Sequence, residues 1–201
     1  METLNVADAT KRLFQSEISL FTLKTLRDIL SLRSQDTLYL YIRKLIHLDV
    51  LTKLERGVYA LSGHPPNEFC IANTIHRPSY ISFETALNVH GILSQFPYEI
   101  TSATTSKPIG KTIQGKLYTY SRVQSAFFFG YEKTNGFLMA TPEKALLDQA
   151  YFAARGLRQF PIDEYDLSRI NKARLTTYLS SLPHTPGTKQ MAKQLSLKIR
   201  I

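Results

Sequence analysis

Apolar residues in the first thirty positions recur every three or four residues, which is the spacing of amphipathic helices that bury one face. This spacing predicts a helix over residues 6–17, with Leu13 and Phe14 on its inner face. It predicts a second helix over residues 23–30, with the hydroxyl of Thr22 as its N-terminal cap.

A third helix and a hairpin are expected next. A polar break at residues 31–34 separates the second helix from a longer one over 35–48. Two β-type runs, 51–54 and 58–61, flank a glycine-containing turn at 55–57. Helix, helix, short turn, longer helix and hairpin is the element order of a winged helix-turn-helix, in which the helix after the turn reads DNA and the hairpin is the wing.

The middle of the chain changes from helical to β-type patterning. A turn-rich linker at 62–67 marks a domain boundary, and helices are expected over 68–76 and 83–90, with an extended stretch at 78–81 between them. Four β-type runs separated by Thr, Ser and Gly turns predict a small antiparallel sheet. These runs cover residues 98–101, 115–120, 126–131 and 136–140.

The remainder is predicted to be helical. Thr141, Pro142 and Glu143 supply a cap, a proline at the first helical position and an acid in the first turn. Two more helices are expected within 161–201, broken at 183–186. The sequence therefore predicts an α+β protein of two domains. A winged helix-turn-helix covers 1–62, and 68–201 form a mixed domain with a small antiparallel sheet and C-terminal helices.

The charge of the chain favours a polyanionic partner. The net charge is +9, divided as +2 over residues 1–62, +1 over 63–150 and +6 over 151–201. The basic helical segment 155–201 is either a binding surface or a solvated face. Because the first domain has few cations to spare, a single copy should bind DNA weakly, and two copies on an inverted repeat should bind better.

Candidate DNA contacts come from the outer face of the third helix and from the hairpin turn. Glutamine pairs with adenine and arginine with guanine in the major groove, whereas lysine and backbone amides suit phosphates. The candidates are Arg33, Ser34, Gln35, Thr37, Tyr39, Arg43 and Lys44 on the helix and its N-terminal end, with Lys53 and Arg56 beside the turn. The alternatives are a small helical domain with solvated cations and a winged helix that binds protein.

The sequence carries none of the common enzyme motifs. It has no GxxxxGK[ST] phosphate loop, no GxGxxG after a strand and no GxSxG elbow. The acids Asp163, Glu164 and Asp166 lie at a helix start, where the helix dipole favours carboxylates, and Asp148 has the simpler role of pairing with a neighbouring base. We expect no enzymatic activity, no cofactor and no metal site.

Other features point to a cytoplasmic protein. Cys70 is the single cysteine, so no disulfide forms within the chain and a reducing compartment fits. No signal peptide is recognisable, and no apolar run reaches the roughly 18 residues of a membrane-spanning helix. The aromatic run of Phe127, Phe128, Phe129 and Tyr131 favours a buried strand over a base-stacking surface.

Three motifs resemble the AbiEi-type antitoxins of type IV toxin–antitoxin systems. Residues 78–87 (PSYISFETAL), followed by His90 and Gly91, and residues 140–148 (ATPEKALLD) resemble the C-terminal domain of that family. Residues 50–59 (VLTKLERGVY) look like the wing of the family. The matches span most of residues 20–150, and three motifs in the right order are considerably stronger than one.

The resemblance implies a protein with two functions. In that family the winged helix binds inverted repeats in the promoter and represses its own operon. The C-terminal domain counteracts a toxin with a nucleotidyltransferase fold, in some systems without a stable complex. The repressor role would fall on residues 33–44 and on the wing, and the antitoxin role on the second domain as a whole. On DNA we expect a monomer or a weak dimer.

Two alternatives remain open at the level of sequence. Four cations of the β region, Lys107, Lys111, Lys116 and Arg122, form either a positive face of the antitoxin domain or ordinary solvated strand edges. The chain as a whole is either the antitoxin or a stand-alone winged-helix regulator whose C-terminal domain binds a ligand or a protein. A nucleic-acid enzyme is the third function considered, and it would require metal-dependent turnover.

Overall fold

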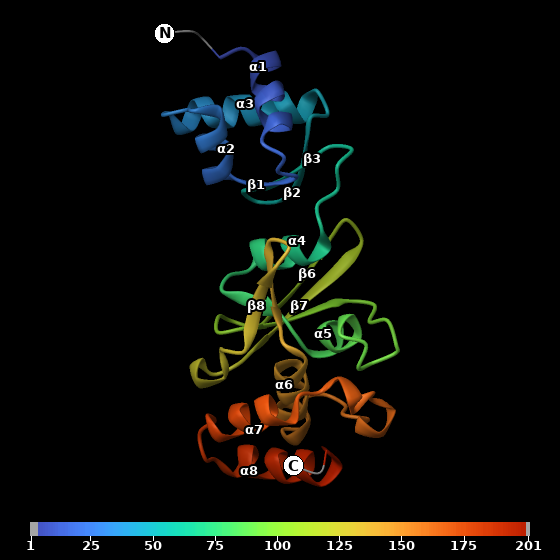
Figure 1. Cartoon of the computed structure of the whole chain (residues 1–201). Helices are drawn as coiled ribbons and strands as arrows, with labels where there is room; N and C mark the ends of the chain where they lie inside the picture. Colours follow the sequence, from blue (N-terminus) through green and yellow to red (C-terminus); the bar gives the residue numbers. More distant parts are fainter. Residues whose placement is uncertain (1–3, 200–201) are drawn as a thin grey trace. The chain divides into compact units, whose positions relative to one another are not determined.

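The computed structural model describes residues 4–199 and divides into two compact units, Met1–Ile75 and His76–Ile201 (Figure 1). The division lies one helix beyond the predicted linker at 62–67. The helix that follows this linker was grouped with the second domain on sequence grounds, and it clusters with the first unit. The composition of residues 62–67 does not indicate which unit the next helix joins.

Unit 1 combines four helices with a three-stranded antiparallel sheet of order β1–β3–β2. Its elements are α1 (Val6–Gln15), β1 (Leu20–Thr22), α2 (Leu23–Leu30), α3 (Gln35–His47), β2 (Leu51–Glu55), β3 (Val58–Leu61) and α4 (Glu68–Ile75). The predicted helices and the hairpin β2–β3 are confirmed. The sequence analysis missed β1, which pairs with β3.

The core of unit 1 lies between its helices and the sheet. Leu13, Leu26, Leu38 and Leu45 are fully buried, one or two from each of α1, α2 and α3. Phe14 was predicted on the inner face of α1, and this was wrong, because its side chain is 47% exposed. The buried stripe of α1 runs through Ala9 and Leu13, which are four residues apart, and the next residue lies about 100° further round the helix.

Unit 2 combines strands and helices, with one α-helix between its first two strands and the others after its last strand. Its strands are β4 (Ser79–Ile81), β5 (Ile100–Thr104), β6 (Ile109–Ile113), β7 (Lys116–Arg122), β8 (Tyr131–Thr134) and β9 (Phe137–Ala140). Its α-helices are α5 (Phe83–Val89), α6 (Pro142–Ala154), α7 (Lys172–Ser180) and α8 (Pro186–Ile199). Short 3-10 helices are η1 (Ser125–Phe127), η2 (Ile162–Glu164) and η3 (Leu167–Arg169).

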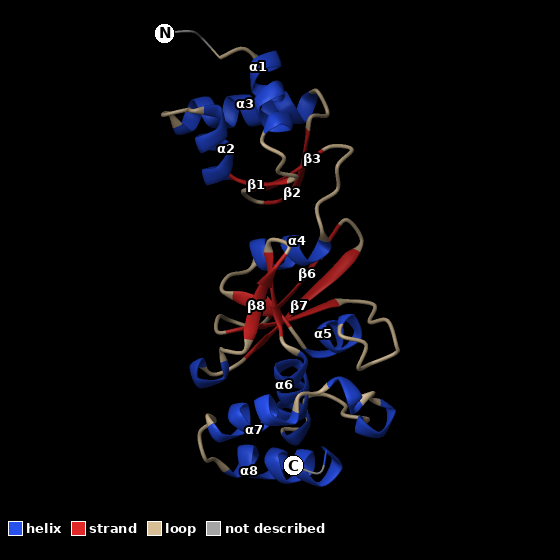
Figure 2. Ribbon diagram, viewed as in Figure 1, coloured by secondary structure: helices blue, strands red, loops and turns tan. Residues whose placement is uncertain are grey.

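The sheet of unit 2 has six strands in the order β6–β7–β5–β4–β9–β8. Figure 2 shows the strands of this sheet in red, including β6, β7 and β8. An antiparallel sheet was predicted without specific pairings, and β4 with β5, β6 with β7, and β8 with β9 are indeed antiparallel. Two further pairings, β4 with β9 and β5 with β7, are parallel. Strand β6 lies at the edge of the sheet, and β7 lies between β6 and β5. Strand β7 therefore runs parallel to β5. The alternation of apolar and polar residues along the sequence does not reveal this strand direction.

Helix α6 lies at the centre of unit 2. The hydroxyl of Thr141 accepts a hydrogen bond from the backbone amide of Lys144 (3.3 Å), and Pro142 occupies the first turn, as predicted. Every residue from 143 to 152 is buried. The helix packs against α5 and strand β9, and α7 and α8 pack against it as well (Figure 1). A helix covered on all sides explains why its polar residues are also buried.

Candidate nucleic-acid interface and buried polar centre

The turn between α2 and α3 leaves the N-terminus of α3 open to solvent. Ser31 ends α2 in the left-handed conformation (φ 54°), and Ser34 caps α3 by accepting a hydrogen bond from the Thr37 amide (3.4 Å). Arg33, Ser34 and Gln35 are exposed at this end. Unpaired backbone amides and the positive end of the helix dipole make such a terminus suitable for phosphate.

A groove of about 500 Å³ lies between α3 and the hairpin. Helix α3 lines it with Tyr39 and Arg43, and the hairpin lines it with Lys53 and Arg56. Four of the predicted DNA-binding residues, separated by up to 17 positions in the sequence, are therefore brought together. Three of the four carry a positive charge, and all three cations are exposed.

The other predicted residues lie on α3 or directly before it. Arg33, Ser34 and Thr37 line a second hollow of about 970 Å³, which α1 closes with Lys11 and Arg12. The sequence analysis missed these two cations, because the packing of α1 beside the α2–α3 turn cannot be read from either segment alone. Arg12 also donates to the carbonyl of Leu30 (3.4 Å).

Lys44 occupies a third position on α3. Its ammonium lies 5.7 Å from the centroid of the Tyr41 ring, at a distance that permits a cation–π contact. The predicted set thus divides into a hairpin-side groove, an α1-side hollow beside the N-terminus of α3, and Lys44 in the last turn of α3. All three positions lie on or beside α3.

Unit 2 contains a buried ion pair. Lys144 and Asp148 lie one turn apart on α6, both side chains are 0% exposed, and their charged groups are in contact. The second oxygen of Asp148 accepts hydrogen bonds from the hydroxyls of Tyr80 (2.9 Å) and Ser82 (2.7 Å). A buried charge is tolerated only where it is paired and hydrogen-bonded, and this carboxylate has three donors.

Aromatic rings complete the surroundings of Lys144. Its ammonium lies 5.4 Å from the centroid of Tyr80, 5.2 Å from that of Phe129 and 6.0 Å from that of Phe127. Burial lowers the pKa of Lys144, and Asp148 opposes this effect. Burial and the Asp148 charge raise the pKa of Tyr80 well above its ordinary value, so its hydroxyl stays a donor.

The aromatic run around Phe128 is not a strand, contrary to the sequence prediction. Residues 125–127 form η1, and the following residues close over Lys144 before β8 begins at Tyr131. Gly130 makes the close approach possible, because its φ is +71° and a Cβ there would lie 3.1 Å from the Lys144 side chain. Contact with the buried ammonium overrides the β-propensity of the run.

The ion pair joins the two motifs on which the resemblance of the second domain rests. Tyr80 and Ser82 belong to residues 78–87, and Lys144 and Asp148 belong to residues 140–148. The parallel pairing of β4 with β9 brings the ends of these strands, and hence the starts of α5 and α6, side by side. The sequence analysis assigned Asp148 a neighbouring base, and the structure identifies this base as Lys144.

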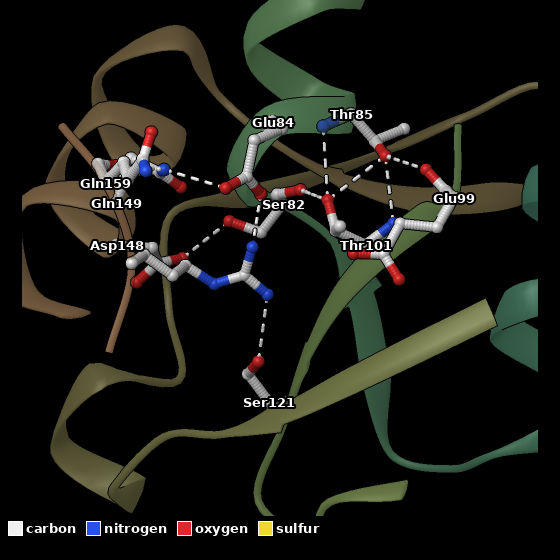
Figure 3. A network of polar contacts seen from close by, with 10 residues as sticks. Ser82, Glu84, Thr85, Glu99, Thr101, Ser121, Asp148, Gln149 and Gln159 are labelled. Atoms are coloured by element: carbon white, nitrogen blue, oxygen red, sulfur yellow. Dashed lines mark hydrogen bonds and ion pairs between the residues drawn. The ribbon is translucent and has the colours of Figure 1, made fainter. Parts of the chain in front are cut away.

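A second polar network lies beside this centre (Figure 3). Glu84 on α5 pairs with Arg158 and accepts a hydrogen bond from the Gln149 amide (2.8 Å). Arg158 also donates to the Ser121 hydroxyl on β7 (3.0 Å), and it lies over the Phe83 ring at 4.2 Å. These contacts attach the segment after α6 to α5 and the sheet.

The predicted basic face of the β region is only partly assembled. Cross-strand register and alternation place Lys111, Lys116 and Arg122 on one face of β6 and β7. Lys111 and Lys116 are half-buried, and Arg122 is exposed. Lys107 precedes β6, and its carbonyl is hydrogen-bonded to the ring of His76 (3.1 Å).

The acidic cluster near residue 163 has structural partners. Asp166 caps η3 by accepting a hydrogen bond from the Ser168 amide (3.0 Å), and Asp163 pairs with Lys198 (2.6 Å). Within residues 4–199, no three His, Cys, Asp or Glu side chains gather closely enough to hold a metal ion. In the same range, no helix combines the length and the apolar character needed to span a membrane.

Comparison with known proteins adds no relative: no protein-family model and no curated protein matches this chain.

Proposed function

We propose that unit 1 is a winged helix-turn-helix that binds duplex DNA. The observation that carries this proposal is the groove where Arg43 of α3 meets Lys53 and Arg56 of the hairpin. Three exposed cations from separate elements converge there, next to a helix whose N-terminus is open. The order α2, turn, α3, hairpin supports the same reading, with α3 as recognition helix and β2–β3 as wing.

In this proposal α3 enters the major groove with its N-terminal end first. Arg33, Gln35 and Arg43 reach base edges. The open amides and Lys44 contact phosphates, and Arg56 extends the contact from the wing. These contacts are few, so a single copy binds weakly and loses affinity steeply with salt. An operator of two inverted half-sites would recruit two copies.

We further propose that the chain is a cytoplasmic antitoxin of the AbiEi type, which represses its own operon and counteracts a toxin of nucleotidyltransferase fold. The support is that both motifs of the second-domain resemblance contribute to one buried centre, where Asp148 binds Tyr80, Ser82 and Lys144.

A salt-titrated gel shift tests the DNA-binding proposal. The full-length protein is titrated on its own upstream promoter duplex and on a scrambled duplex of equal length. We expect the promoter to bind tighter by roughly a thousandfold or more. Equal affinity for both duplexes would contradict sequence-specific recognition.

Co-expression tests the antitoxin proposal. The chain is produced together with the product of an adjacent nucleotidyltransferase gene, and growth is compared with production of that product alone. We expect the chain to restore growth. Failure to restore it, with promoter binding intact, would favour a stand-alone winged-helix regulator.

A further inference from the structure

The C-terminal helices of unit 2 carry an unbalanced charge. No Asp or Glu occurs after Asp166, whereas residues 167–201 contain seven Lys and Arg residues. Chains that only need solubility mix both signs of charge on a surface. The cations of this 35-residue run can therefore pair only with anionic groups outside the run.

Some of these cations find carboxylates elsewhere in unit 2. Lys198 pairs with Asp163 (2.6 Å), Arg169 lies 3.8 Å from Asp166, and Arg174 lies 3.7 Å from Glu143. Within residues 4–199, Lys172, Lys189 and Lys193 take part in no ion pair, and all three are exposed.

Two of the unpaired lysines are neighbours on α8. Lys189 and Lys193 are four residues apart, so their ammonium groups lie on the same helix face, where like charges destabilise a helix. The sequence places this unfavourable pair one turn apart. An anion with repeated charges would relieve the repulsion.

A groove between α7 and α8 borders this surface. It has a volume of about 300 Å³, and Lys189, His184 and several hydroxyl side chains line it together with the apolar Leu179, Leu182 and Met191. The hydroxyls of Thr176 and Ser180 donate to backbone carbonyls of α7, so Lys189 is the charged group that the groove offers to an anion. Hydroxyl groups and lysines are the side chains that commonly contact phosphates and sugars of nucleic acids.

We propose that the α7–α8 surface binds the sugar–phosphate backbone of duplex DNA without sequence preference, as a second contact of this chain. Lysine is depleted at protein–protein interfaces, so the exposed Lys189 and Lys193 fit a nucleic acid better than an acidic protein. Tyr178, the aromatic residue of α7, is half-buried against Phe129 and is not available for stacking on bases. The choice of duplex DNA rests on the proposed function, because unit 1 would bring DNA to the same chain.

Charge-removing variants of the full-length protein test this proposal. Lys189→Gln, Lys193→Gln and the double variant are compared with Lys133→Gln, which makes the same change on the exposed strand β8. Affinity for the scrambled duplex is measured against salt concentration. We expect the slope of log K against log salt to fall by about one for each lost phosphate contact. The promoter-to-scrambled ratio should stay unchanged, because phosphate contacts carry no sequence information.

Each possible result decides the matter. A double variant with the salt slope of Lys133→Gln would overturn the proposal, and so would a change confined to duplex RNA of the same sequence. If the wild-type protein shows no preference for its promoter, the proposed repressor function fails, yet the slope still reports on α8. Thermal unfolding checks folding, and the double variant should be at least as stable as wild type, because the like-charge pair is removed.

Discussion

Asp148 joins three donors from two distant stretches of the chain, since Lys144, Tyr80 and Ser82 all bind its carboxylate. Neither charge of the ion pair touches solvent. Removing one partner of such a pair leaves the other charge buried without compensation, which costs far more than the net stabilisation from the intact pair. Removing the charge of one side chain in this centre should therefore strongly lower the stability of unit 2.

We expect Asp148→Asn to lower the free energy of unfolding of unit 2 by about 3–5 kcal/mol, because the Lys144 ammonium loses its counter-charge. Urea unfolding of the full-length chain measures the change. Asp163→Asn is the matched control. Its side chain is 80% exposed beside Lys198, and exposed pairs contribute at most about 1 kcal/mol. Equal losses in the two variants would show that the buried pair has no special role.

The raised pKa of Tyr165 leads us to expect a loss of stability at alkaline pH. Its side chain is 8% exposed, and burial, followed by the charges of Glu84 and Glu164, raises its pKa. In the unfolded chain a tyrosine ionises near pH 10, so above that pH the unfolded state binds fewer protons than the folded state. Stability then falls with rising pH, by about 1.4 kcal/mol per pH unit for each such tyrosine.

The measurement is the urea midpoint between pH 9 and pH 11 in the wild type and two variants. Tyr165→Phe should flatten the decline, and Tyr80 accounts for part of what remains, since its pKa is raised as well. Tyr98→Phe removes a tyrosine that is 84% exposed and should leave the decline as it is. Identical curves for Tyr165→Phe and Tyr98→Phe would refute the assignment.

At the scale of elements, local signals predicted helix starts well. The side chains of Thr22 and Thr141 do cap α2 and α6, because a cap depends only on the first turn of its own helix. Strands β1 and β6 were missed. A three-residue strand such as β1 is stabilised by its hydrogen bonds to β3. The residues Leu20–Thr22 alone show no pattern that predicts this pairing.

The candidate sites show the same division between local and distant information. The outward position of the cations of α3 and the hairpin followed from helical spacing and turn position, and Arg43 and Arg56 line one groove in the structure. Lys144 and Asp148, by contrast, have the spacing of an ordinary surface pair on a helix. Their burial depends on the sheet, α7 and α8 packing around α6. The nearly continuous apolar run of α6 is the one signal in the sequence that hinted at it.

The helix and the hairpin of unit 1 should contribute differently to DNA binding. Arg43→Ala on α3 is expected to weaken promoter binding by about 1–3 kcal/mol and to relax specificity, because it removes a base contact. Lys44→Ala and Arg56→Ala should weaken binding to promoter and scrambled duplexes alike, since they remove backbone contacts.

Gel shifts on both duplexes measure these changes, and Lys133→Ala on β8 is the control for loss of one positive charge in unit 2. If Arg43→Ala, Lys44→Ala and Arg56→Ala all bind like the control, the DNA-binding face has been assigned to the wrong side of unit 1. Loss of folding is checked by circular dichroism, although all three side chains are exposed and make little contribution to the core.

At the scale of the whole molecule, the chain consists of two compact units that each bury their own core. Leu38 of α3 is fully buried in unit 1, and Leu146 of α6 is fully buried in unit 2. Units with separate cores can unfold separately, and a protein of two domains need not show a single two-state transition. The two proposed functions could then be lost independently.

Calorimetry of core variants tests this independence. Replacing a buried leucine by alanine costs about 2–5 kcal/mol through lost contacts and the cavity left behind. Leu38→Ala should therefore lower the midpoint temperature of one of two heat-capacity peaks, and Leu146→Ala should lower that of the other. The midpoint temperature of the remaining peak should stay unchanged in each variant. Because only unit 1 is proposed to hold the operator contacts, promoter DNA should raise the midpoint temperature of the peak that Leu38→Ala shifts down. A single peak that moves as a whole in both variants would show one cooperative unit, and DNA binding would then be coupled to the packing of α6.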